Sequence, residues 1–243
     1  MAAPAPPERG PGEFDVTTPH GVAGVVLDVP PRRAAGLLVL GHGAGGGVDA
    51  PDLVAVRDAA VAAGWAVARV TQPYRMQGRR APAPAGQLDT AFVAAVAECR
   101  RQVGARLPLV VGGRSSGARV AARTAARVGA IGVLALAFPL HAPGRPAATR
   151  AGELDPDRPT LVLNGDADPF GVPTPVGEVR VVVRPGERHD LRRDPAGTAA
   201  AAVAWLNTLV PARARRPRAG GARSDPGGGV TMADPPSFTR TER

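Results

Sequence analysis

Five short apolar runs without polar alternation recur along this chain of 243 residues, and they constrain its fold more than any other feature. They are GLLVLG (36–41), WAVARV (65–70), LPLVVGG (107–113), IGVLALAF (131–138) and PTLVLNG (159–165). A strand that is apolar at successive positions is covered on both faces, as in a parallel sheet. Stretches with helical spacing of apolar residues lie between these runs, and such alternation favours right-handed crossovers. The sequence therefore predicts an α/β protein with a mostly parallel central sheet and helices on both faces.

The remaining elements follow from the same patterns. We expect further strands at 21–29 and 178–183, and helices at 51–63, 87–103, 116–129 and 195–209. In such sheets the ligand binds at the carboxyl ends of the strands, so residues that directly follow a strand matter most for function.

The two ends of the chain differ from the rest. Residues 1–12 are rich in Pro, Ala and Gly, and residues 211–243 are rich in Arg, Gly and Pro. Neither has apolar periodicity, so both are predicted to be disordered. No internal repeat is found, and 13–210 is predicted to form one domain, large enough to bury a substantial core.

The chain is basic, with a formal net charge of +9, and all 30 of its basic residues are Arg. The segment 211–243 carries seven of them against three acidic residues, which is compatible with non-specific polyanion affinity. Nucleic-acid binders usually add aromatic residues for stacking, and aromatic residues make up only 3% of this chain. Specific nucleic-acid recognition is therefore not expected as the main function.

The sequence favours a cytoplasmic protein that needs no cofactor or metal. Cys99 is the only cysteine, which excludes a disulfide within the chain and a cysteine-rich zinc site. No uncharged apolar run approaches the ~18 residues of a membrane span. The segment MAAPAPPERGPGEF has no apolar stretch typical of a signal peptide, and the sequence leaves the oligomeric state open.

The motif with most chemical meaning is Gly113-Arg114-Ser115-Ser116-Gly117, which fits G-x-S-x-G. It stands between the apolar run 107–113 and a predicted helix, which is the strand–turn–helix context of a nucleophile elbow. Glycines two residues either side avoid collisions across the sharp turn, and the following helix favours developing negative charge. Ser115 is therefore the candidate nucleophile, although a Gly-rich turn without catalytic function has the same composition.

A second glycine-rich loop, GHGAGGG (41–47), also directly follows a predicted strand. Its backbone N–H groups, with that of Ala44 as the candidate, and the N–H of Ser116 can form an oxyanion hole. A phosphate-binding turn is disfavoured, because the chain has neither G-x-G-x-x-G opening a helix nor G-K-[ST]. His42 precedes the nucleophile in the chain, an order this mechanism does not use, so it is expected to hold the loop or to border the substrate.

A serine hydroxyl needs a general base. The chain has His20, His42, His141 and His189, and only His189 follows the last predicted strand. His141, in FPLHAPGRP, is the alternative base and otherwise a candidate substrate contact.

The orienting acid is expected after the strand 159–165, at Asp166 or Asp168, and the spacing alone leaves both open. Pro169 favours an extended, rigid Asp168, whereas Asp166 follows Gly165 and is expected to cap the turn with its own side chain. Either choice gives the order Ser, Asp, His.

Five blocks in order resemble the small α/β-hydrolases near dienelactone hydrolase, and in particular the KANL/Tex-like α/β-hydrolase family. They are LVLGHGAGG, VVGGRSSGARVA, FPLHAPGRP, LNGDADPFG and GERHDL, spanning roughly residues 36–210. The resemblance implies the α/β-hydrolase fold with Ser115 as nucleophile, Asp168 as acid and His189 as base. The sequence departs from the dienelactone hydrolases proper, where a cysteine is the nucleophile, because Cys99 lies within a predicted helix.

Two further features bear on the substrate. Arg75, Arg79 and Arg80 follow the strand 65–70 and are candidates for binding an anionic substrate, since guanidinium groups match carboxylate and phosphate. A solvated loop explains them equally well. The linker 138–158 is too short for a lid domain, so an open site and a small or exposed substrate are expected.

The leading hypothesis is a serine hydrolase that cleaves a small-molecule ester or thioester through an acyl-enzyme. The first alternative is a non-catalytic protein of the same fold that acts as an interaction or scaffold part, because fold alone does not establish catalysis. The second is a nucleic-acid-associated protein that works through its Arg-rich C-terminal segment.

Overall fold

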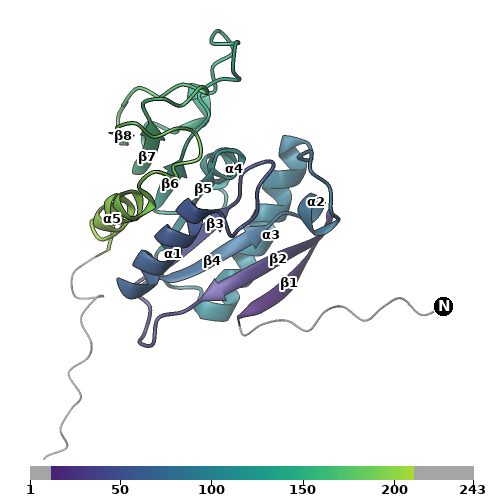
Figure 1. Ribbon diagram of the computed structural model, residues 1–243. Helices are drawn as coiled ribbons and strands as arrows, with labels where there is room; N and C mark the ends of the chain where they lie inside the picture. The colour runs from purple at the N-terminus through teal and green to yellow at the C-terminus, as the bar shows by residue number, and fades with distance from the viewer. Residues whose placement is uncertain (1–11, 211–243) are drawn as a thin grey trace, which may run out of the picture.

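A computed structural model describes residues 12–210, which form one eight-stranded sheet with helices on both faces (Figure 1). The strands are β1 (Glu13–Thr18), β2 (Gly21–Asp28), β3 (Leu37–Gly41), β4 (Ala66–Thr71), β5 (Leu109–Arg114), β6 (Gly132–Leu136), β7 (Thr160–Gly165) and β8 (Val179–Arg184). Their order across the sheet is β1-β2-β4-β3-β5-β6-β7-β8. The pairs β1–β2 and β2–β4 are antiparallel, and all others are parallel.

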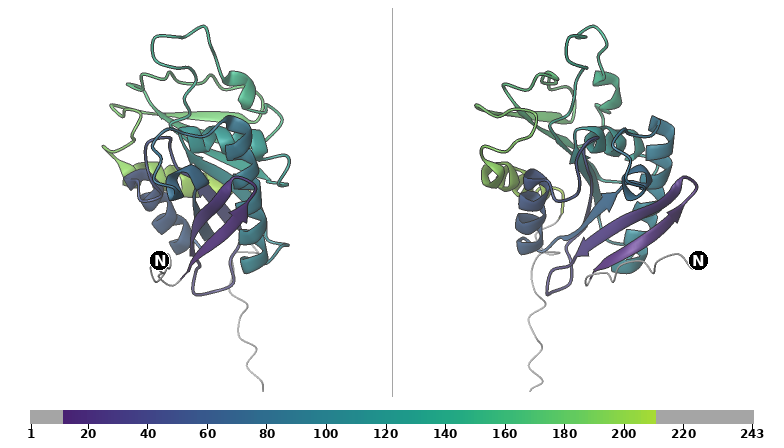
Figure 2. Two further views of the ribbon diagram at one scale, coloured as in Figure 1. Left: turned by 90° about the vertical axis from the view of Figure 1, so that its right-hand side faces the viewer. Right: turned by 45° about the vertical axis from the view of Figure 1, so that its right-hand side comes forward.

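The helices divide between the two faces of the sheet. They are α1 (Pro51–Ala62), α2 (Pro73–Met76), α3 (Ala85–Val103), α4 (Ser116–Thr124) and α5 (Pro195–Leu206), with a 3₁₀ turn η1 (Ala151–Glu153). Helices α1 and α5 pack together on one face, and α3 and α4 cover the other, as both views in Figure 2 show.

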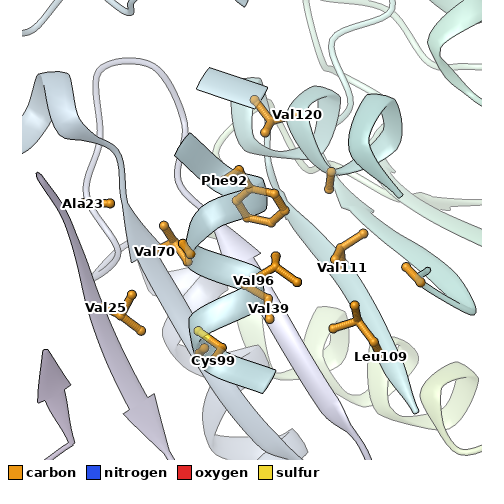
Figure 3. Close-up of a cluster of buried hydrophobic side chains, with 14 of the residues drawn as sticks. Ala23, Val25, Val39, Val70, Phe92, Val96, Cys99, Leu109, Val111 and Val120 are labelled. Carbon is orange, nitrogen blue, oxygen red and sulfur yellow. The ribbon is translucent and has the colours of Figure 1, made fainter. Parts of the chain in front are cut away.

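The strand β3 explains why the apolar runs show no polar alternation. Leu38 and Leu40 point into the cluster beneath α1 and α5, whereas Leu37 and Val39 point into the cluster beneath α3 and α4. Figure 3 shows the second cluster, where Phe92 and other side chains of α3 meet the strands. Because both faces of the central strands are covered, every position of β3 is buried.

The expected strands and helices are all present, within a few residues of their predicted ends except in one case. Helix α4 ends at Thr124 and not at 129; residues 125–129 form turns, and Gly129 at their end adopts a φ of +64°. Three elements were missed: the edge strand β1, the single-turn helix α2 and the 3₁₀ turn η1. The segments 1–12 and 211–243, which the sequence predicts to be disordered, lie outside the described residues apart from Gly12, so that prediction and the domain limits stay predictions.

The connection from β6 to β7 contains only η1 and turns, and no lid domain is inserted there. Its η1 is held to the body of the protein by Glu153, which pairs with Arg119 and Arg123 of α4. Arg123 also pairs with Asp89 of α3. Within residues 12–210, no helix is long and apolar enough to cross a membrane.

Candidate active site

Ser115 occupies a sharp turn between the last residue of β5 and the first residue of α4. Its backbone has φ 52° and ψ −111°, a strained conformation for a residue other than glycine. The turn packs closely against β3: a Cβ on either Gly113 or Gly117 would collide with the carbonyl oxygen of Gly41. Only glycine fits at these two positions. The sequence predicted a collision across the turn, and a Cβ on Gly113 would indeed lie 2.8 Å from the carbonyl carbon of Gly117, but the collisions with β3 were not predicted.

His189 and Ser115 lie within hydrogen-bond distance. The imidazole Nε2 of His189 is 2.8 Å from the Ser115 hydroxyl oxygen. On the other side of the ring, Nδ1 lies 2.9 Å from Oδ2 and 3.1 Å from Oδ1 of Asp168. The structure thus brings together the three side chains that the sequence singled out.

The carboxylate that meets His189 belongs to Asp168 and not to Asp166. The Asp168 side chain is fully buried, and its Oδ1 accepts a 2.8 Å hydrogen bond from the backbone N–H of Phe170. Asp166 was expected to cap its own turn, and this detail is wrong. Its Oδ1 accepts instead from the N–H of Gly186, in the loop that carries His189, and so braces that loop from outside.

The glycine-rich loop after β3 passes directly beside the nucleophile. A Cβ built on Gly43 would lie 3.6 Å from the Cβ of Ser115. The carbonyl of Ala44 accepts a 2.8 Å hydrogen bond from the hydroxyl of Tyr74 in α2, which fixes this part of the loop. Ser116 opens α4, so its N–H is one of the first of the helix, which have no partner within it.

His42 is buried behind this loop, with 3% of its surface exposed. Its Nε2 accepts from the backbone N–H of Gln72, so Nδ1 carries the proton and donates to the carbonyl of Gly43. Burial, the main cause, together with the nearby charge of Arg75 lowers the pKa of His42, which keeps the ring neutral. With both nitrogens engaged, His42 is placed to hold the loop and not to contact a substrate.

The other substrate-binding candidates lie on the β6–β7 connection, in α2 and on the loop after α2. The ring of His141 packs on Gly171, and its backbone N–H donates to the carbonyl of Phe170. Arg75 lies in α2, where its Nη1 donates to the carbonyl of Arg79. Arg79 and Arg80 are exposed on the loop after α2. Their role in substrate binding stays a prediction.

Comparison with known protein families shows to which family the chain belongs. Residues 34–191 match the alpha/beta hydrolase domain family, which is about two-thirds of the chain. The chain belongs to this family. No curated protein sequence matches it.

Solved structures share the fold of this alpha/beta hydrolase. XC6422 from Xanthomonas campestris, described as an a/b serine hydrolase without lid, has 21% identity and a TM-score of 0.66, over 85% of this chain and 99% of that chain. Dienelactone hydrolase from Anabaena variabilis has 20% identity and a TM-score of 0.65, over 82% and 98%. Est1E from Butyrivibrio proteoclasticus with ferulic acid bound has 15% identity and a TM-score of 0.69, over 81% of this chain and 98% of that chain. The suspected resemblance is confirmed as an α/β-hydrolase fold without a lid.

Three residues that position the site of this hydrolase were not singled out from the sequence. Asn164 of β7 is buried, and its Nδ2 lies 3.3 Å from Asp168 Oδ2 and 3.1 Å from the carbonyl of Phe138. Phe170 stacks on the His189 ring with centroids 4.1 Å apart. Buried Glu187 accepts two backbone N–H groups of its own loop, at 2.5 and 3.1 Å. The signal for Asn164 was present, since it is the one polar residue inside the apolar run LVLNG.

Proposed function

We propose that this protein is a serine hydrolase that cleaves a carboxylic ester or thioester through a Ser115–His189–Asp168 triad. One observation carries the proposal: a single imidazole bridges a strained serine hydroxyl at 2.8 Å and a buried carboxylate at 2.9 Å. That arrangement is the one by which a general base activates a hydroxyl nucleophile.

In the first half of the reaction, Ser115 Oγ attacks the acyl carbon while its proton moves to His189 Nε2. Asp168, bound to Nδ1, holds the imidazole in the tautomer that leaves Nε2 free to accept, and stabilises the imidazolium. The backbone N–H groups of Ser116 and Ala44 receive the oxyanion. His189 then returns the proton to the leaving group, which departs as an alcohol or thiol and leaves the acyl group on Ser115.

In the second half, water attacks the acyl carbon while His189 takes its proton, and the carboxylic acid leaves as Ser115 recovers its proton. The residues present suffice for both halves, since the base, the acid and the backbone donors all come from this chain. The proposal needs no cofactor or metal ion.

The substrate is proposed to be small or exposed, because the connection 137–159 contains only the 3₁₀ turn η1 and no inserted lid domain. Similarity in fold to a dienelactone hydrolase supports an ester. Location in the cytoplasm and the absence of specific nucleic-acid binding stay predictions.

The test combines a covalent probe with turnover. A fluorophosphonate is expected to label Ser115, identified by peptide mapping, and p-nitrophenyl esters of graded chain length are expected to be cleaved. Ser115→Ala is expected to abolish both, with a loss on the order of 10⁶ in kcat. Thr90→Ala removes an exposed hydroxyl of α3 as a control. If the wild-type protein shows neither labelling nor turnover, the non-catalytic scaffold is the better description.

A further inference from the structure

An ion pair that the proposed triad does not use lies directly beneath it. Arg114 is the last residue of β5 and directly precedes Ser115. Its Nε lies 3.2 Å from Oδ2 of Asp52, in the first turn of α1. The exposed fraction of the side chain is 16% for Arg114 and 0% for Asp52.

The same guanidinium contacts the loop that carries the proposed base. Arg114 Nη2 donates to the backbone carbonyl of His189 at 3.3 Å. Its third nitrogen, Nη1, borders the oxyanion loop: a Cβ built on Gly43 would lie 3.3 Å from it, and one built on Gly46 3.8 Å. The side chain of Arg114, which itself belongs to the turn of Ser115, therefore contacts both the loop that carries His189 and the glycine-rich loop after β3.

The Asp52 carboxylate is hard to explain as a stabilising feature. Among residues 12–210, neither of its oxygens has a hydrogen-bond partner. Burial raises its pKa to about 6; the charge of Arg114 and the nearby backbone N–H groups of Leu53 and Asp52 oppose this, and the charge of Asp190 adds to it. A buried carboxylate whose pKa is raised in this way destabilises the fold when it is charged, and a neutral residue of the same shape would not.

We propose that Arg114 is a positioning residue for the hydrolysis: its guanidinium, oriented by the Asp52 carboxylate, fixes the backbone of His189 relative to Ser115. The inference rests on the proposed function, because only a proton transfer between these two side chains requires such accuracy. A misplacement of about 1 Å in a reacting pair lowers a rate by about 100-fold. The nucleophile needs no separate support from Arg114, since the two residues are adjacent in the chain.

Two substitutions test the proposal on a p-nitrophenyl ester. Arg114→Gln removes the charge and the fork of donors, and Asp52→Asn keeps the shape of the side chain and removes its charge. Both are expected to lower kcat by about 10- to 100-fold with KM changed less than threefold. Because Asp52 is proposed to act through Arg114, the double variant is expected to be no slower than Arg114→Gln alone.

The pH dependence separates positioning from a merely structural role. The groups that face Asp52 are Arg114 of β5 and Asp190 of the β8–α5 loop. At pH 5 about nine-tenths of Asp52 is protonated in the wild-type protein, so a ratio of about 10 to 100 between wild-type and Asp52→Asn kcat/KM at high pH is expected to fall to about 2 to 10. The ratio is expected to rise with a midpoint near pH 6 and to level off above pH 7. Effects of pH that are common to both proteins divide out of the ratio.

A matched control removes another ion pair of the same helix. Arg57 of α1 pairs with Asp28 of β2 at 2.9 Å, and Arg57→Gln is expected to leave kcat and its pH dependence unchanged. Wild-type kcat in both site variants, or a ratio that is constant from pH 5 to 8, would overturn the positioning role. Failure of the wild-type protein to react with a fluorophosphonate would overturn the proposed function itself, and the inference with it.

Discussion

Replacing Asp52 by Asn is expected to make the protein more stable at neutral and alkaline pH. Burial raises the pKa of this carboxyl from its ordinary value of 3.8 to about 6 in the folded protein. The folded state therefore binds the proton more tightly than the unfolded state does. Between pH 4 and pH 6 the unfolded chain ionises first, and the free energy of unfolding of the wild-type protein falls as pH rises.

The size of the effect follows from that difference. One pKa unit corresponds to 1.36 kcal/mol, so a move from 3.8 to about 6 destabilises the wild-type protein by about 3 kcal/mol above pH 6. The raised pKa already includes the attraction of Arg114, so losing that partner is not a further penalty. For a domain of this size about 3 kcal/mol corresponds to roughly 6–12 °C in Tm. Below pH 4 the two proteins are expected to melt together.

Thermal or urea unfolding of both proteins at pH 4, 5, 6 and 8 measures this difference. Asp28→Asn is the control, because its partly exposed carboxylate pairs with Arg57 and Arg69, and such pairs contribute about 0–1 kcal/mol. That variant is expected to lose a little stability and not to gain any. A lower Tm for Asp52→Asn than for wild type at pH 8 would show that the buried pair stabilises the fold, and the reasoning would be wrong.

Three further predictions concern the site. Asp168→Asn is expected to lower kcat by about 10⁴, through the wrong imidazole tautomer, and Asp166→Asn by less than tenfold; equal losses in steady-state kinetics would contradict the assignment. His189→Ala is expected to remove turnover, whereas His141→Ala is expected to alter mainly KM, and the reverse result would move the base. Gly117→Ala is expected to unfold or strongly destabilise the protein, because its Cβ would collide with backbone; an unchanged Tm would refute this.

The fold was predictable because its central strands are buried on both faces. Such strands appear in the sequence as uninterrupted apolar runs, for example LPLVVGG, which can be recognised directly. The edge strand β1 has only one packed face, and its sequence EFDVTT alternates apolar and polar residues. A search for uninterrupted apolar runs passes over such a strand, although its alternation with period 2 was there to be read.

The placement of Ser115 in the turn and of His189 beside it was predictable because local rules restrict both residues. Glycines at 113 and 117 leave few alternatives to a sharp turn at Ser115, and chain order selects His189. The direction of a carboxylate in a loop follows no such rule. Asp166 turns away because the N–H of Gly186 lies within reach of its side chain, a contact set by how β7 and β8 pair.

The ion pair between Arg114 and Asp52 could not be predicted from the sequence. In the sequence, Arg114 occupies the variable position of G-x-S-x-G, and Asp52 is an ordinary acid in the first turn of a predicted helix. Their ion pair becomes apparent only in the structure, where the first turn of α1 lies against the end of β5. A substitution that raises Tm at pH 8 while lowering kcat would mean that the charge of Asp52 is kept in spite of its effect on stability. A residue with a purely structural role would lose stability and activity together, so measuring both on Asp52→Asn distinguishes the two explanations.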